Sequence, residues 1–172
     1  MKHVTFAALA ALALSACGGG QPANAQGAGS AAPIQIGPAP GANQGSEPAA
    51  AFLAKNALAA GVKSLPSGLQ YQVLKSGPAG GKSPTLDDQV TVHYEAILPS
   101  GEVLDSSYER GEPTTFPLRG LVKAWEEALP LMKPGDQWLL WAPSELAYGA
   151  EGKGPVPPGA VLKFRIELVR VN

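Results

Sequence analysis

A tyrosine and an aspartate on the two strands of one predicted hairpin, residues 90–107, are the side chains best suited to bind or polarise a ligand. Apolar and polar residues alternate from Val90 to Leu98, so Tyr94 lies on the apolar, core-facing side of the first strand. After a Pro-Ser-Gly turn at 99–101, the return strand leads to Asp105, directly behind two apolar residues. An inward hydroxyl needs a partner or a ligand, and a carboxylate beside an apolar surface is costly unless it is paired. The hairpin therefore predicts that the Tyr94 hydroxyl and the Asp105 carboxylate lie close together at one site.

Several other chemistries lack the residues that they need. Outside the first 16 residues the sequence has one histidine, His93, which falls on the outward face of its strand and is expected to be solvated. A histidine metal cluster is therefore excluded, a Ser-His-Asp triad is improbable, and the segment 76–83 (SGPAGGKS) has Ser76 where a phosphate loop needs glycine. With 13 basic and 14 acidic residues, the chain lacks the positive charge of a nucleic-acid binder. We expect no metal, no cofactor and no nucleic acid.

The first 17 residues have the pattern of an export signal. Lys2 is followed by an apolar run, Val4 to Leu14, that is shorter than the roughly 20 residues needed to cross a membrane. The pattern predicts a signal peptide at 1–16, with a buried helix as the alternative. The sequence Leu-Ser-Ala-Cys resembles the bacterial lipoprotein signal, which implies that Cys17 carries the lipid anchor. Because Gly18 follows, the resemblance implies a protein of the bacterial cell envelope, lipid-anchored at the outer membrane and facing the periplasm or the surface.

Two segments separate the signal from the predicted domain. After its cysteine, the segment 17–46 has no charged residue and consists mostly of Gly, Ala, Pro, Gln and Asn, which predicts a disordered linker. A structured alanine-rich segment is the alternative. In the segment 47–65, charged residues return and Pro48 to Ala60 has a helix-forming composition that ends at Gly61. We expect a short helical lead-in there.

The sequence pattern of the domain itself, residues 66–172, predicts mostly short strands. The strands are expected at 68–74, 88–98, 102–104, 114–118, 137–141 and 162–168. One helix is predicted at 122–129, because Val122, Trp125 and Leu129 form an apolar stripe. The run 137–141 is apolar on both faces, as a central strand covered on both sides would be. The pattern predicts an α+β fold in which an antiparallel sheet wraps around one short helix.

The combined motifs of residues 66–172 resemble the FKBP-type peptidyl-prolyl isomerases. The matching stretches, in order and spacing, are VHYEAILPSGEVLDSS, EPTTFPL, VKAWEEALPLMKPGDQWLL and SELAYGAEGKGPVPPGAVLKFRIELVRV. The preceding FLAKNALAAGVKSLPSGLQYQVL resembles the linker helix and first strand of the macrophage-infectivity-potentiator branch. Members of that branch normally carry an N-terminal helical dimerisation domain, in whose place this sequence has the linker, so we expect a monomer.

This resemblance implies a fold and a set of site residues. The implied fold is an FKBP-like twisted antiparallel sheet, half-wrapped around the helix, with the pocket between sheet and helix. Tyr94, Asp105 and Tyr148 are implied as catalytic residues, with Tyr148 donating a hydrogen bond to a substrate carbonyl. The implied substrate-binding residues are Leu104, Arg110, Phe116, Leu121, Val122, Trp125, Val156 and Phe164. Among them Trp125 is the pocket floor and Arg110 holds Asp105.

The implied activity is cis-trans isomerisation of peptidyl-prolyl bonds, which assists the folding of envelope or secreted proteins. Its partners are proline-containing polypeptides and, as ligands, macrolides of the tacrolimus and rapamycin type. Leu104 stands where the family usually has phenylalanine, so we expect weaker macrolide binding than in a typical member. The alternative function is a non-catalytic chaperone or protein-binding module that uses the same pocket. A third interpretation, a surface adhesin on a tether, is supported only by the lipoprotein-like signal.

Overall fold

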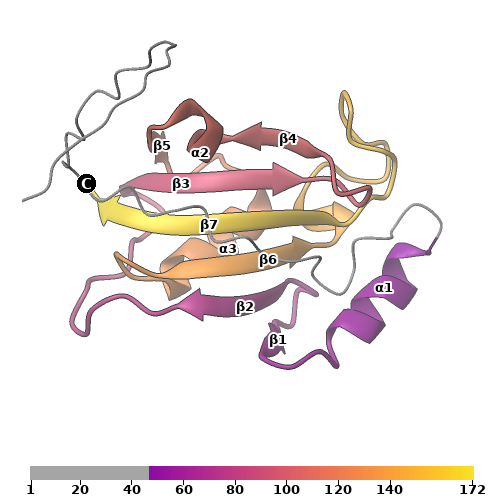
Figure 1. Cartoon of the computed structure of the whole chain (residues 1–172), viewed down its shortest axis with the longest axis horizontal. Helices are drawn as coiled ribbons and strands as arrows, with labels where there is room; N and C mark the ends of the chain where they lie inside the picture. The colour runs from indigo at the N-terminus through magenta and orange to yellow at the C-terminus, as the bar shows by residue number, and fades with distance from the viewer. Residues whose placement is uncertain (1–46) are drawn as a thin grey trace, which may run out of the picture. The chain divides into compact units, whose positions relative to one another are not determined.

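The computed structural model describes residues 47–172, which form three helices and seven strands (Figure 1). The helices are α1 (Ala49–Asn56), α2 (Ser107–Arg110) and α3 (Lys123–Ala128). The strands are β1 (Val62–Ser64), β2 (Gln70–Lys75), β3 (Gln89–Ile97), β4 (Val103–Ser106), β5 (Thr114–Pro117), β6 (Gln137–Ala142) and β7 (Leu162–Val171). Two 3₁₀ turns complete the list, Leu129–Leu131 and Ser144–Leu146.

All seven strands belong to one antiparallel sheet. The order across it is β1-β2-β6-β7-β3-β4, with β5 paired to the first part of β3. The long central pair β3 and β7 places Tyr94 opposite Ile166 and Ala96 opposite Phe164. The register between β3 and β4 places Ala96 opposite Asp105. In Figure 1 the helix α3 lies behind this sheet, so the expected antiparallel sheet around a short helix is confirmed.

The main hydrophobic core fills the space between α3 and the inner face of the sheet. The alternation along β3 puts Val90, Val92 and Tyr94 into this core, as the sequence predicts. The helix contributes Trp125 and Ala128, which are 5% and 0% exposed. Burying these side chains fixes α3 against β3, the strand that carries Tyr94.

A second, smaller core covers the opposite, outer face of the sheet. There Phe52 of α1 packs with Leu139 and Trp141 of β6 and with Val161. The amide of Gln70 joins the helix to β2: it accepts a hydrogen bond from Asn56 at 2.8 Å and donates one to the carbonyl of Leu53 at 2.7 Å. With α1 on one side and the main core on the other, β6 is buried along its whole length, which confirms the predicted central strand.

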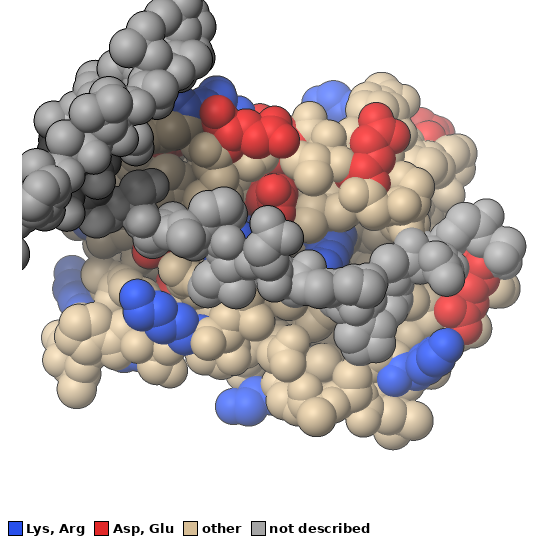
Figure 2. All heavy atoms as spheres, viewed as in Figure 1, with Lys and Arg blue, Asp and Glu red and all other residues tan. Residues whose placement is uncertain are grey.

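Charged side chains of both signs lie on the outer face of the sheet. The cross-strand neighbours of β3 and β7 there include Glu95 with Arg165, and His93 with Glu167. Figure 2 shows Lys and Arg next to Asp and Glu on the described part of this face. The predicted signal peptide 1–16, the predicted lipidation site Cys17 and the predicted linker 17–46 lie outside the described residues. Within 47–172, no helix is both long and apolar enough to span a bilayer.

The turn before β6 is held by a buried carboxylate, Asp136. It accepts hydrogen bonds from the backbone N–H of Gly77 at 2.6 Å and from the backbone N–H of Lys133 at 3.0 Å, and it pairs with the Lys133 ammonium at 2.7 Å. Burial alone would raise the pKa of the Asp136 carboxyl, but these bonds outweigh it and hold the pKa below the ordinary value of 3.8.

A lowered pKa makes this contribution to stability depend on pH. It is fully present above about pH 3.8, the unfolded value, and is lost as the pH falls through the lower folded value. We expect Asp136→Asn to lower the free energy of unfolding by about 2 kcal/mol at neutral pH and by much less near the folded pKa. Urea unfolding of both proteins at neutral and at strongly acidic pH measures this. A stability difference that stays constant with pH would contradict it.

Candidate ligand pocket

A cavity of about 210 Å³ opens between α3 and the inner face of the sheet, and we call it the inner cavity. Its residues come from β3, β4, β5, β7, the start of α3 and the loop after β6. They are Tyr94, Ala96, Leu104, Asp105, Phe116, Leu121, Val122, Trp125, Tyr148 and Phe164. Most of these side chains are apolar or aromatic, so the cavity suits a compact apolar group.

Aromatic rings in edge-on contact form the floor and two walls of the inner cavity. The ring of Trp125 lies 5.3 Å from that of Tyr94, 6.1 Å from that of Phe116 and 5.8 Å from that of Phe164, with interplanar angles of 73° to 83°. Such edge-to-face contacts are favourable and fix the ring planes. The indole N–H of Trp125 is buried and has no hydrogen-bond partner in the described part of the chain.

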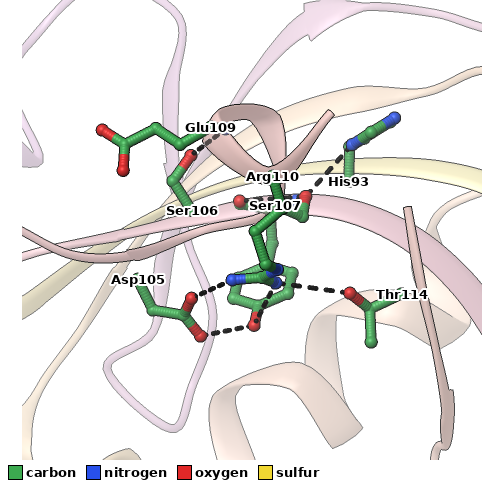
Figure 3. Close-up of polar contacts among 8 residues, drawn as sticks. His93, Asp105, Ser106, Ser107, Glu109, Arg110 and Thr114 are labelled. Carbon is green, nitrogen blue, oxygen red and sulfur yellow. Dashed lines mark hydrogen bonds and ion pairs between the residues drawn. The ribbon is translucent and has the colours of Figure 1, made fainter. Parts of the chain in front are cut away.

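Three polar residues at the mouth of the inner cavity form what we call the rim cluster: Tyr94, Asp105 and Arg110. The Tyr94 hydroxyl donates to one Asp105 oxygen at 2.5 Å, and the Arg110 guanidinium pairs with the other. Arg110 also donates to the Tyr94 hydroxyl at 3.0 Å and to the Thr114 hydroxyl at 3.3 Å. Figure 3 shows Arg110 reaching from α2 toward both Asp105 and Thr114. The Asp105 carboxylate, which would be costly beside apolar residues if it were unpaired, is therefore paired with Tyr94 and Arg110.

The rim cluster shifts the ionisation of its members. Burial, followed by the hydrogen bond to Asp105, raises the pKa of the Tyr94 hydroxyl. Burial would raise the pKa of the Asp105 carboxyl, but the hydrogen bonds from Tyr94 and Arg110 outweigh it and the pKa is lowered. At neutral pH the cluster consequently holds a neutral tyrosine, a carboxylate and a guanidinium.

Local sequence explains how Arg110 reaches its position. Ser106, the last residue of β4, caps α2 by accepting the backbone N–H of Glu109 at 3.3 Å. Gly111 then ends the helix at a φ of 77°, a conformation that glycine adopts without strain. One helical turn between these two residues is enough to bring Arg110 back over Asp105.

The structure brings most of the sequence-predicted site residues to the inner cavity. Tyr94, Asp105 and Tyr148 line it, as do six of the predicted substrate-binding residues: Leu104, Phe116, Leu121, Val122, Trp125 and Phe164. Arg110 adjoins it through the rim cluster.

Two placements differ from the predicted set. Val156 is not on the cavity wall: it pairs with Lys153 in a tight turn and is buried in the main core at 7% exposure. Ala96 lines the cavity although it was not predicted as a site residue. The signal for Ala96 was available, because the alternation of β3 puts it on the same face as Tyr94.

His93 also differs from the sequence interpretation. His93 is half-buried and not fully solvated, because Tyr108 of α2 stacks on its ring at 4.8 Å and the Ser107 hydroxyl contacts its Nδ1 at 3.1 Å. The sequence places His93 on the outward face correctly, but α2 folds back over that position. No group of His, Cys, Asp and Glu side chains suited to a metal ion occurs among residues 47–172.

Sheet, helix, aromatic floor and rim cluster together define a small-ligand pocket of a half-wrapped α+β domain, and the comparisons with known proteins agree with that class. Residues 80–169 match the family model described as FKBP-type peptidyl-prolyl cis-trans isomerase. Residues 38–73 match the model of the domain amino-terminal to that isomerase. The chain belongs to the FKBP-type peptidyl-prolyl cis-trans isomerase family.

Individual relatives support this assignment. The chain is 50% identical over 127 residues to the peptidyl-prolyl cis-trans isomerase Mip of Coxiella burnetii, which covers 73% of this chain and 54% of that protein. It resembles the crystal structure of FkpA from Escherichia coli with a TM-score of 0.67 and 40% identity, over 72% of this chain and 57% of that one. For a Pseudomonas syringae peptidyl-prolyl cis-trans isomerase the values are 0.66 and 36%, over 72% and 90%. The chain spans about half the length of the curated relatives that it matches.

Proposed function

We propose that this protein catalyses the cis-trans isomerisation of peptidyl-prolyl bonds in polypeptide substrates. The observation that carries the proposal is the inner cavity, which has an aromatic floor and the rim cluster at its mouth. Its size and apolar walls suit a proline ring, and its opening leaves the rest of an extended chain outside. The relatives named above carry this activity in their names.

The chemistry requires neither a nucleophile nor a cofactor. Rotation about an X-Pro bond has a barrier of about 20 kcal/mol because amide resonance is lost as the bond twists. Moving the amide from water into an apolar cavity disfavours its planar, charge-separated form, and groups that grip only the twisted form bind the transition state selectively. An acceleration of about 10⁵ to 10⁶ corresponds to roughly 7 to 8 kcal/mol.

The residues divide this work between them. The proline ring lies over Trp125, between Tyr94 and Phe164, where edge-on aromatic contacts keep the walls rigid. The Tyr148 hydroxyl, on a ring that is 36% exposed at the mouth, donates to a substrate carbonyl. Val122 stands at the N-cap of α3, where its backbone N–H has no partner within the helix and is available to the substrate chain.

A protease-coupled assay on an X-Pro peptide, with and without tacrolimus, tests the proposed activity. We expect a rate well above the uncatalysed one, and we expect tacrolimus to inhibit it by occupying the inner cavity. A wild-type rate equal to the uncatalysed rate refutes the proposal. In that case, suppression of client aggregation by the wild type that is weakened by changes in the cavity would favour a chaperone that uses the same pocket without isomerase activity.

Leu104 is expected to weaken macrolide binding. It lines the inner cavity where the family usually has phenylalanine, so one edge-on aromatic contact is missing. We expect Leu104→Phe to tighten tacrolimus binding by about two- to twelvefold, measured by calorimetry, since such a contact contributes about 0.5 to 1.5 kcal/mol. Val103→Phe is the matched control, because Val103 is on the same strand but is not part of the cavity lining. Equal or weaker binding by Leu104→Phe would be evidence against this role.

We also propose that the domain works in the bacterial envelope on folding envelope or secreted proteins, held by lipid on Cys17. The support is the lipoprotein-like sequence around Cys17 and the relative named outer membrane protein MIP of Legionella longbeachae. Cys17→Ser should move the protein from the membrane fraction to the soluble periplasmic fraction and abolish the incorporation of labelled fatty acid. Unchanged fractionation and labelling would exclude the anchor.

A further inference from the structure

Ser107 contacts the rim cluster through the backbone of Tyr94 and is not part of the inner-cavity lining. It is the first residue of α2 and is fully buried. Its hydroxyl oxygen accepts the backbone N–H of Tyr94 at 2.8 Å, and its proton can be donated to the Tyr94 carbonyl at 3.3 Å. The same oxygen lies 3.1 Å from Nδ1 of His93, a contact drawn in Figure 3.

Through these contacts the Ser107 hydroxyl makes the hydrogen bonds to Tyr94 that the backbone of a longer β4 would otherwise make. The register of β3 with β4 runs through Ala96 opposite Asp105, so the next hydrogen-bonded pair would set the backbone of residue 107 against Tyr94. The chain has turned into α2 by that point. The Ser107 hydroxyl takes over both bonds, and the buried N–H and C=O of Tyr94 remain satisfied.

Because a side chain replaces these backbone bonds, β4 can end at the rim cluster while β3 remains hydrogen-bonded there. The chain can leave the sheet immediately after Asp105, which it must do for α2 to return Arg110 to that carboxylate. Strand β3 nevertheless stays fixed at Tyr94, whose hydroxyl must meet Asp105 at 2.5 Å. We propose that Ser107 is a positioning residue for catalysis, which holds Tyr94 and Asp105 in register while α2 carries Arg110 over them.

The proposal rests on the proposed isomerase function, but its consequence for Tyr94 can be measured without any activity. In Ser107→Ala the N–H and C=O of Tyr94 lose their partner in a fully buried place, so β3 must shift to satisfy them. The Tyr94 hydroxyl then moves away from Asp105. Tyrosine labelled at Cζ with a heavy carbon isotope reports the ionisation of each ring by NMR, and Tyr94→Phe assigns the Tyr94 signal.

In the full-length protein we expect Tyr94 to titrate above its ordinary pKa of 10.0, and in Ser107→Ala to titrate at a lower pH than in the wild type, because burial still raises the pKa but the hydrogen bond to Asp105 no longer does. Ser107→Cys keeps a weak donor and acceptor in nearly the same place and should give an intermediate value. Thr115→Val is the matched control, because it removes another hydroxyl bond across β3, that with Thr91, outside the rim cluster. An unchanged Tyr94 titration in folded Ser107→Ala overturns the proposal, and if that variant does not fold, an unchanged titration in Ser107→Cys does so.

Kinetics provide the second readout. We expect Ser107→Ala to lower kcat/KM roughly tenfold, since small displacements of positioned groups are costly. Adding Tyr94→Phe to Ser107→Ala should then lower kcat/KM much less than Tyr94→Phe does in the wild type. Effects that simply multiply would mean that Ser107 acts on stability alone and not through Tyr94. If the wild type shows no isomerase activity, the proposed function fails, and the NMR titration still decides the role of Ser107.

Discussion

Replacing Asp105 with alanine is expected to lower kcat/KM for an X-Pro peptide by about 10²-fold while the domain stays folded. Asp105 holds both other members of the rim cluster, the Tyr94 hydroxyl and the Arg110 guanidinium. Without the carboxylate these two groups lose their fixed orientation, and an unpaired positive charge remains at the mouth of the cavity. Stability should change little, because the Asp105 side chain is 48% exposed and partly exposed ion pairs contribute little to folding.

The protease-coupled assay and a urea unfolding curve on the same preparations measure these two effects. Asp87→Ala is the control, since Asp87 also pairs with an arginine, Arg119, but is 81% exposed and outside the inner cavity. We expect the control to keep kcat/KM within about twofold of the wild type. If Asp105→Ala is as active as the control, the rim cluster has no part in catalysis.

Phe52→Ala is expected to lower the free energy of unfolding by about 3 to 5 kcal/mol, the usual cost of removing a buried phenylalanine. Phe52 is 4% exposed and fills the outer-face core against Leu139 and Trp141. The loss would show that α1 is an integral part of the folded domain. Because this core and the inner cavity lie on opposite faces of the sheet, kcat/KM of the remaining folded protein should be unchanged.

Urea unfolding followed by tryptophan fluorescence measures the loss, and Leu58→Ala is the matched control. Leu58 follows α1 closely in the sequence but is 88% exposed, so its replacement should change stability by no more than about 0.5 kcal/mol. Equal stability of Phe52→Ala and Leu58→Ala would show that α1 does not stabilise the sheet.

Much of the site could be predicted from short-range patterns. The period-two alternation of β3 is enough to turn Tyr94 inward, because successive side chains of a strand point to opposite faces. The turn after β3 determines that Asp105 returns alongside it. Trp125 is placed by the apolar stripe of α3, which has to face the core. In each case the local pattern of apolar residues shows which side of the strand or helix must be buried, and so where the side chain points.

Other features depend on where α2 lies, which no local pattern reports. His93 has the outward position of a solvated residue, yet Tyr108 covers it. Ser107 reads as a small polar residue in a turn, yet it is fully buried and replaces a backbone pair. Val156 was expected among the substrate-binding residues by resemblance, but it pairs with Lys153 in a turn and is buried in the main core.

The sequence by itself determined six of the seven strands, all but β1, together with the helix α3, the family motifs and the two residues, Tyr94 and Asp105, that had to meet. Periodicity carries this information because only the residues on the core-facing side of a strand or helix are buried, and they recur at a fixed spacing. The resemblance already implied that Arg110 holds Asp105. Only the tertiary structure decided that the Tyr94 hydroxyl joins this pair, what covers the outer face and which hydroxyl fixes Tyr94. Those answers depend on contacts between residues far apart in the chain, such as Arg110 with Tyr94 and Phe52 with Trp141, which form only when the sheet and its helices pack together.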